Sequence, residues 1–121
     1  MSPRVDLKLR LWCNGEIALG PGKAELLAAI AHTGSISAAA RSLEMSYRRA
    51  WLLVDTMNRC FTEPLVVTLA GGKRGGGAQV TAAGQDVLTR YRRMQDKAKA
   101  AISADLEALS PLLKSSPSDR A

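Results

Sequence analysis

Two of the serines in residues 34–50, Ser35 and Ser46, each stand directly before a stretch of helix-forming residues. Ser35 precedes a short run rich in Ala and Ser, and Ser46 precedes a longer amphipathic stretch. Serine is a preferred N-cap residue, so each of the two predicts the start of a helix. The small side chains of Ala39 and Ala40 allow the two helices to cross steeply at a short turn. The segment is therefore typical of a helix-turn-helix.

The flanking segments predict two β-hairpins and two more helices. In chain order we expect strands over 7–12 and 16–19, a helix over 23–32, the two helices of the motif, strands over 65–69 and 78–80, and a helix from 83 towards 109. Asn14 and Gly15 accept the successive positive φ angles of a tight turn between the first two strands. The glycine-rich run 71–77 cannot bury a core, so we expect it to form a loop. This order predicts a mainly α fold with a small β component: a winged helix-turn-helix with an N-terminal β-hairpin and a long C-terminal helix.

The chain is expected to divide into a winged helix-turn-helix domain over 1–82, a dimerisation helix over 83–110 and a disordered tail over 111–121. The tail is expected because it is polar and rich in Ser and Pro. In the helix, apolar residues recur about every 3.5 positions, which suits packing against a second chain, with packing inside one chain as the alternative. The residues expected at this dimer contact are Val87, Tyr91, Met94, Ala98 and Ile102.

The positive charge of the chain is concentrated in its middle. The net charge is +6 and the isoelectric point is about 9.8. Residues 41–93 carry nine Lys and Arg against four Asp and Glu, whereas residues 1–40 and 94–121 are close to neutral. Such a surplus favours a nucleic acid or an acidic membrane surface as partner. Because it coincides with the predicted helix-turn-helix, we expect double-stranded DNA.

The first turn of the second helix of the motif is expected to reach the base edges of DNA. After Ser46 it carries Tyr47, Arg48 and Arg49. An arginine can pair with guanine through two hydrogen bonds, or it can bind a phosphate. The alternative is a plain helical hairpin whose arginines are solvated.

Two further pairs of residues are expected to contact the DNA backbone. Ser35 and Ser37 can offer hydroxyl and amide groups to a phosphate. In the glycine-rich loop, Lys73 and Arg74 suit contact with a phosphate or the minor groove, with a solvated loop as the alternative. A phosphate-binding loop of an enzyme is not expected, because Lys73 is not followed by Ser or Thr and no helix begins at the loop.

Several other classes of protein do not fit the sequence. Cys13 and Cys60 belong to no CxxC motif or Cys/His cluster, so neither a zinc site nor a disulfide framework is expected. His32 stands at a helix end without a nucleophile, so we expect no catalytic residue and no enzyme activity. Since no stretch resembles a signal peptide or a membrane span, we expect a cytoplasmic protein without membrane contact. Trp51 can pack between helices or lie near the DNA backbone, and both interpretations remain open.

Several short motifs together carry a resemblance to a known family. They are Gly34-Ser35-Ile36-Ser37-x-Ala39-Ala40, Met45-Ser46-Tyr47-Arg48-Arg49-Ala50-Trp51, Met57-Asn58, the glycine-rich run 71–77 and Thr81-x-x-Gly84. These motifs resemble the helix-turn-helix of the ModE-type molybdate-responsive regulators. More distantly, the same frame resembles the LysR-type regulators.

The resemblance implies a bacterial regulator that dimerises through the N-terminal hairpin and the terminal helices, with the recognition helices in successive major grooves. Full-length members also carry C-terminal modules that bind molybdate. No segment after residue 100 has the pattern of such a module, so we expect no cofactor and no specific molybdate binding by this chain. Any regulation would then come from a partner such as a separate sensor protein, from the expression level of the chain, or not at all. We therefore expect a sequence-specific transcription regulator, with a basic architectural DNA- or RNA-binding protein of little sequence preference as the alternative.

Overall fold

The computed structural model describes residues 3–70 and 77–114. The chain divides into two compact units, which are described separately. The winged unit comprises Lys8–Arg92, and the terminal unit comprises residues 3–7 and 93–114 of the described chain. Lys73 and Arg74, and residues 115–121 of the expected tail, lie outside the described residues.

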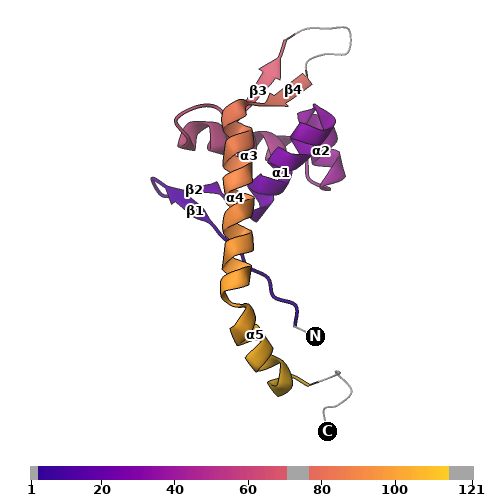
Figure 1. Cartoon of the computed structure of the whole chain (residues 1–121). Coiled ribbons are helices and arrows are strands. Elements are labelled where there is room, and N and C mark those ends of the chain that lie inside the picture. The colour runs from indigo at the N-terminus through magenta and orange to yellow at the C-terminus, as the bar shows by residue number, and fades with distance from the viewer. Residues whose placement is uncertain (1–2, 71–76, 115–121) are drawn as a thin grey trace. The chain divides into compact units, whose positions relative to one another are not determined.

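The order of helices and strands follows the predicted order. The elements are β1 (Leu11–Cys13), β2 (Glu16–Leu19), α1 (Pro21–Thr33), α2 (Ile36–Ser42), α3 (Tyr47–Cys60), β3 (Val66–Leu69), β4 (Gly77–Val80), α4 (Ala82–Ala101), α5 (Ser103–Leu109) and the 3₁₀ helix η1 (Ser110–Leu112). Figure 1 shows α1, α2 and α3 as a group from which the β1–β2 and β3–β4 hairpins emerge on different sides. Each hairpin is an antiparallel two-stranded sheet. The predicted fold class, a mainly α winged helix-turn-helix, is confirmed.

The core of the winged unit is formed by aliphatic side chains and methionine. Its largest fully buried side chains are Leu26, Leu27, Ile30, Val54, Met57 and Leu65. On α2, Ala39 and Ala40 are buried as well, and their small side chains let α2 pack closely against α1 and α3. The close approach expected within the helix-turn-helix is therefore present.

The β1–β2 hairpin has the predicted turn but a shorter first strand. Asn14 and Gly15 both have positive φ angles, 50° and 81°. The first strand was expected from residue 7, whereas β1 begins at Leu11. The pairing register shifts between Leu11 and Trp12, and such an irregularity interrupts the ladder of hydrogen bonds.

The β3–β4 hairpin is attached to α3 by the side chain of Asn58. Its Nδ2 donates a hydrogen bond to the carbonyl of Val66 at 2.9 Å. Its Oδ1 accepts hydrogen bonds from the amides of Leu65 at 2.8 Å and Val66 at 3.2 Å. One half-buried side chain thus pairs three main-chain groups at the base of the β3–β4 hairpin, which is the wing of the fold.

Replacing Asn58 with Ala is expected to lower the free energy of unfolding by about 2–3 kcal/mol, because three main-chain groups lose their partner in a partly buried place. Urea unfolding would measure the change. The matched control on the same helix is Thr56→Ala, since the Thr56 hydroxyl donates to the carbonyl of Leu52 inside α3. That control should change the free energy by less than about 0.5 kcal/mol. Equal losses in the two variants would contradict the role of Asn58.

The start of α4 is held against the base of the same hairpin. Thr81 caps α4 as predicted, because its Oγ1 accepts a hydrogen bond from the amide of Gly84 at 3.0 Å. The same hydroxyl donates to the carbonyl of Pro64 at 2.7 Å, and the Thr81 amide donates to the carbonyl of Leu65 at 2.9 Å. The first turn of α4 and the start of β3 are therefore tied together.

The helix expected over 83–110 is two helices, so the prediction of one continuous helix was wrong. Helix α4 ends at Ala101, and Ile102 has a φ of −102° and a ψ of 4°. Ser103 Oγ donates to the carbonyl of Ala100 at 2.9 Å, and such a local bond competes with the helical backbone. No residue of α5 or η1 is buried, so packing within the terminal unit does not oppose the break.

Candidate nucleic-acid interface

Helices α2 and α3 begin at the two serines predicted to cap them. Ser35 Oγ accepts a hydrogen bond from the amide of Ala38 at 3.1 Å, and Ser46 Oγ accepts one from the amide of Arg49 at 3.0 Å. Between the helices, Glu44 adopts a φ of 55°, a conformation that glycine adopts more easily. The caps and this tight turn determine where the first-turn side chains of α3 project.

The first two turns of α3 expose one face to solvent. Tyr47 is 54% exposed and Leu52 is 55% exposed, and Arg48 and Arg49 are exposed as well. The opposite face, which includes Val54, is buried in the core. Across residues 3–70 and 77–114, neither arginine forms an ion pair. Both guanidinium groups are therefore available to an anionic partner.

The cation at the other end of α3 has a different environment. Arg59 donates hydrogen bonds to both carboxylate oxygens of Glu16, at 2.8 and 3.1 Å, and to Asp55 at 2.9 Å. The bonds from Arg59 lower the pKa of the Glu16 carboxyl, although desolvation opposes this effect. The charge of Arg59 is thus balanced inside the chain, whereas the arginines at the start of α3 form no ion pair with a described residue.

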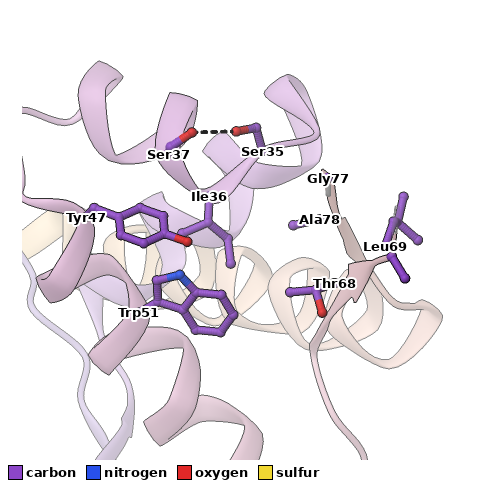
Figure 2. Close-up of a pocket in the computed structure, with 10 residues that line it drawn as sticks. Ser35, Ile36, Ser37, Tyr47, Trp51, Thr68, Leu69, Gly77 and Ala78 are labelled. Carbon is purple, nitrogen blue, oxygen red and sulfur yellow. Dashed lines mark hydrogen bonds between the residues drawn. The ribbon is translucent and has the colours of Figure 1, made fainter. Parts of the chain in front are cut away.

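A groove of about 380 Å³ lies between the start of α2, one edge of α3 and the β3–β4 hairpin (Figure 2). On α3 it is bounded by the rings of Tyr47 and Trp51, whose centroids are 6.2 Å apart and whose planes are nearly perpendicular. Ser35 and Ser37 lie at its rim with their hydroxyls 3.0 Å apart, and Thr68 lines the wall formed by the hairpin. Aromatic, hydroxyl and main-chain groups therefore meet in one hollow that is open to solvent.

The structure brings together those predicted DNA-contact residues that it describes. They all lie at the starts of α2 and α3: Ser35, Ser37, Ser46, Tyr47, Arg48 and Arg49. Lys73 and Arg74 of the predicted wing tip lie outside the described residues. The sequence left the position of Trp51 open, and its spacing of four from Tyr47 is the signal that places both rings on one edge of α3. Nothing in the sequence indicated that Thr68 lines the same groove.

The residues expected at a dimer contact have different environments. Tyr91 was expected to contact a partner but packs in the core of its own chain: it is 2% exposed, and its hydroxyl donates to the carbonyl of Leu9 at 2.7 Å. Val87 is half-buried against the same core. In the terminal unit, Met94 is 47% exposed, and Ala98 and Ile102 are half-buried.

The described residues contain neither a metal-ligand cluster nor a membrane-spanning helix. Within them, no group of three or more His, Cys, Asp or Glu residues is placed to hold a metal ion. Cys13 and Cys60 are free thiols, and both are half-buried. None of the helices there has the length and apolar character needed to cross a lipid bilayer.

The helix-turn-helix and the wing match a known family. A model of the bacterial regulatory helix-turn-helix proteins of the lysR family matches residues 22–85, which is more than half of the chain. The chain belongs to the lysR family. The lysR-family match runs from α1 through the motif and the wing to the first turn of α4. It therefore contains the groove and the exposed first turn of α3.

Within this lysR-family frame, the chain is similar to larger proteins whose names refer to molybdenum. It is 41% identical to the molybdenum transport protein ModE of Azotobacter vinelandii, over 76% of this chain and 34% of that protein. It is 48% identical to the molybdenum-pterin-binding protein MopB of Rhodobacter capsulatus, over 60% of this chain and 27% of that protein. The chain thus spans about a third or less of the length of these relatives. The predicted resemblance to ModE-type regulators is confirmed over that part.

A solved structure has the same fold. The chain is similar to the DNA-binding domain of CbnR, which was solved in a complex with DNA, with a TM-score of 0.55. The similarity covers 72% of this chain and 94% of that chain, at 23% sequence identity. It supports the winged-helix architecture independently of the sequence matches.

Proposed function

We propose that the chain is a sequence-specific, DNA-binding transcription regulator that acts in the bacterial cytoplasm. The observation that carries the proposal is the first turn of α3, where Arg48 and Arg49 are exposed and form no ion pair with a described residue. In a helix-turn-helix, the start of the second helix enters the major groove and reads base edges. Membership of the lysR family supports the same assignment.

Each part of the interface has a role in this proposal. The guanidinium groups at the start of α3 pair with guanine edges or bind phosphates. The start of α2, with Ser35 and Ser37 at the rim of the groove, binds a phosphate and thereby sets the register of the protein on the duplex. Tyr47 and Trp51 supply an aromatic wall that can pack against sugars or base edges.

A comparison of affinities at fixed salt tests the proposal. Duplexes that bind would be selected from a randomised pool, and their affinity would be compared with that of shuffled duplexes by fluorescence anisotropy. A specific regulator should bind the selected duplex at least ~10³-fold more tightly. Equal affinities would contradict the proposal and favour an architectural DNA- or RNA-binding protein. The outcome separates the two hypotheses because electrostatic binding alone is insensitive to sequence.

We also propose that this regulation concerns molybdenum metabolism. The support is the names of the relatives, among them ModE proteins and the molybdenum-pterin-binding protein MopB. Mapping the sites that the chain occupies in a bacterial genome tests the idea. Occupancy next to genes for molybdenum uptake or cofactor use is expected, and occupancy unrelated to such genes would contradict it.

We propose that the chain binds DNA as a homodimer and that Met94 contributes to the dimer contact. Met94, Ala98 and Ile102 follow one another at intervals of four, and Met94 exposes much of its apolar side chain. Tyr91 and Val87 are left out of the contact, because they pack inside their own chain.

The substitution Met94→Glu is expected to raise the dimer dissociation constant at least about tenfold, because burying an unpaired carboxylate costs several kcal/mol. Sedimentation equilibrium measures the constant. The control on the same helix is Thr89→Glu, which adds the same charge at an exposed position and should leave dimerisation unchanged. A monomeric wild-type chain, or equal constants for both variants, would contradict this contact.

A further inference from the structure

We propose that a second hollow of the winged unit binds a phosphate group of the DNA backbone, on the edge of α3 opposite the groove. This hollow, called the basic pocket, has a volume of about 260 Å³ and is lined by four cations: Lys8, Arg10, Lys23 and Arg49. The inference rests on the proposed function and extends it, because three of these residues precede the helix-turn-helix in the chain.

The cations of the basic pocket come from three separate segments. Lys8 and Arg10 precede β1, Lys23 lies in the first turn of α1, and Arg49 lies in the first turn of α3. In the part of the chain that the structure describes, none of the four forms an ion pair. The carboxylate of Glu16 acts on Lys23, but it is already held by two hydrogen bonds from Arg59. The positive charge of the pocket is therefore not balanced by an ion pair with any residue that the structure describes.

The environment of Lys23 also favours an anion. Burial lowers the pKa of Lys23, and the positive charge of Arg49 lowers it as well. A bound phosphate would oppose both effects, because a negative charge stabilises both cations. The N-cap residue of α1, Gly20, forms no side-chain cap, so amide groups of the first turn add hydrogen-bond donors beside these cations.

The basic pocket and the groove lie along opposite edges of α3. Successive residues of an α-helix are turned by about 100°, so Tyr47 and Arg49 project about 200° apart. One turn further on, Trp51 lines the groove and Leu53 lines the basic pocket. The exposed Arg48 projects between them. A helix that enters the major groove has a phosphate backbone on each side, so each hollow faces a different strand.

Substitution of the two pocket residues outside α3 tests the inference. The double variant Arg10→Ala/Lys23→Ala is compared with Arg92→Ala/Arg93→Ala, which removes two exposed cations of α4 that form no ion pair among the described residues. Loss of one phosphate contact should reduce the magnitude of the slope of log K against log salt by about 0.9. It should also lower the affinity for selected and for shuffled duplexes by the same factor. The α4 variant should keep the wild-type slope, and thermal unfolding checks that both variants are folded. Equal slopes in the two variants would overturn the inference.

A scan of the DNA backbone identifies the phosphate. Single phosphates of the selected duplex are replaced in turn by neutral methylphosphonates. On the strand that faces the basic pocket, one replacement should weaken DNA binding by the wild-type chain. The same replacement should leave DNA binding by Arg10→Ala/Lys23→Ala unchanged. The same sensitivity at every position in both proteins would overturn the inference while leaving the proposed function intact. A wild-type chain that binds no duplex would overturn both.

Inorganic phosphate distinguishes a backbone phosphate from a free anion. The wild-type chain is titrated with inorganic phosphate in the absence of DNA, and the amide signals of the pocket residues are followed by NMR. We expect no saturable binding below millimolar concentrations, because a backbone phosphate is positioned by the rest of the DNA interface. Saturable micromolar binding that is lost in Arg10→Ala/Lys23→Ala would show a free-anion site and overturn the DNA assignment.

Discussion

The substitution Gly84→Ala is expected to lower the free energy of unfolding by about 3 kcal/mol. Gly84 is buried in the first turn of α4, against the base of the wing. An added Cβ would overlap the carbonyl oxygen of Leu65 and lie 2.6 Å from Cγ1 of Val80. The obstacle includes main chain that Asn58 and Thr81 already hold in place, so it cannot move away cheaply.

The control for this substitution is Gly22→Ala on α1. Apart from its chain neighbours and the backbone of its own helix, no described residue places an atom within 4 Å of a Cβ built at Gly22. Alanine should therefore stabilise the chain by about 0.4–1 kcal/mol, since it reduces the freedom of the unfolded chain. Urea unfolding of the two variants should thus show shifts of opposite sign. A stability of Gly84→Ala equal to that of the wild type would contradict the packing at the base of the wing.

The double substitution Arg48→Ala/Arg49→Ala is expected to weaken binding to a selected duplex by about 2–6 kcal/mol, which is roughly thirty-fold or more. The first turn of α3 exposes both guanidinium groups without an ion-pair partner among the described residues. The double substitution deletes Arg48, which is proposed to reach a base edge, and Arg49, which is proposed to bind a backbone phosphate, and it leaves the Ser46 cap of α3 in place. Fluorescence anisotropy at fixed salt measures the loss.

The single variants separate base reading from phosphate binding. Arg48 projects between the two hollows, so Arg48→Ala should also reduce the preference for the selected sequence. Arg49 lines the basic pocket, so Arg49→Ala should lower the affinity for selected and for shuffled duplexes by the same factor. The variant Arg92→Ala/Arg93→Ala removes the same charge from α4 and serves as the control. Losses as large in that control as in Arg48→Ala/Arg49→Ala would show that net charge, and not α3, carries the binding.

The features that the sequence predicted well depend on local chemistry. Ser35 and Ser46 cap the helices that follow them, because a serine hydroxyl and a nearby free amide pair wherever a helix begins. Asn14 and Gly15 form the first turn because both tolerate a positive φ. The same reasoning placed most of the candidate interface, since its residues lie directly after the capping serines.

The features that the sequence did not predict depend on contacts between distant segments. Tyr91 has the spacing of a dimer contact, but its hydroxyl reaches the carbonyl of Leu9, at the other end of the chain. The helical spacing of apolar residues identifies an apolar face, but it does not show whether that face packs against the same chain or against a partner. The break at Ile102 coincides with a local hydrogen bond from Ser103 Oγ to the carbonyl of Ala100, and the apolar pattern of the sequence did not indicate it.

The basic pocket was hidden for a similar reason. Residues 1–40 are almost neutral overall, so charge counting drew attention to residues 41–93 alone. Only the folded chain brings Lys8, Arg10 and Lys23 beside Arg49. Clusters that are built from distant segments require the tertiary structure.

Mapping the DNA contact on the chain by NMR is the most direct test of the central claim that the starts of α2 and α3 form the interface. Backbone amide shifts of the 121-residue chain would be followed while a selected duplex is added. We expect the largest changes at residues 35–37 and 46–53, with little change in α5. Large changes confined to α4 and α5, with residues 46–53 unaffected, would contradict it.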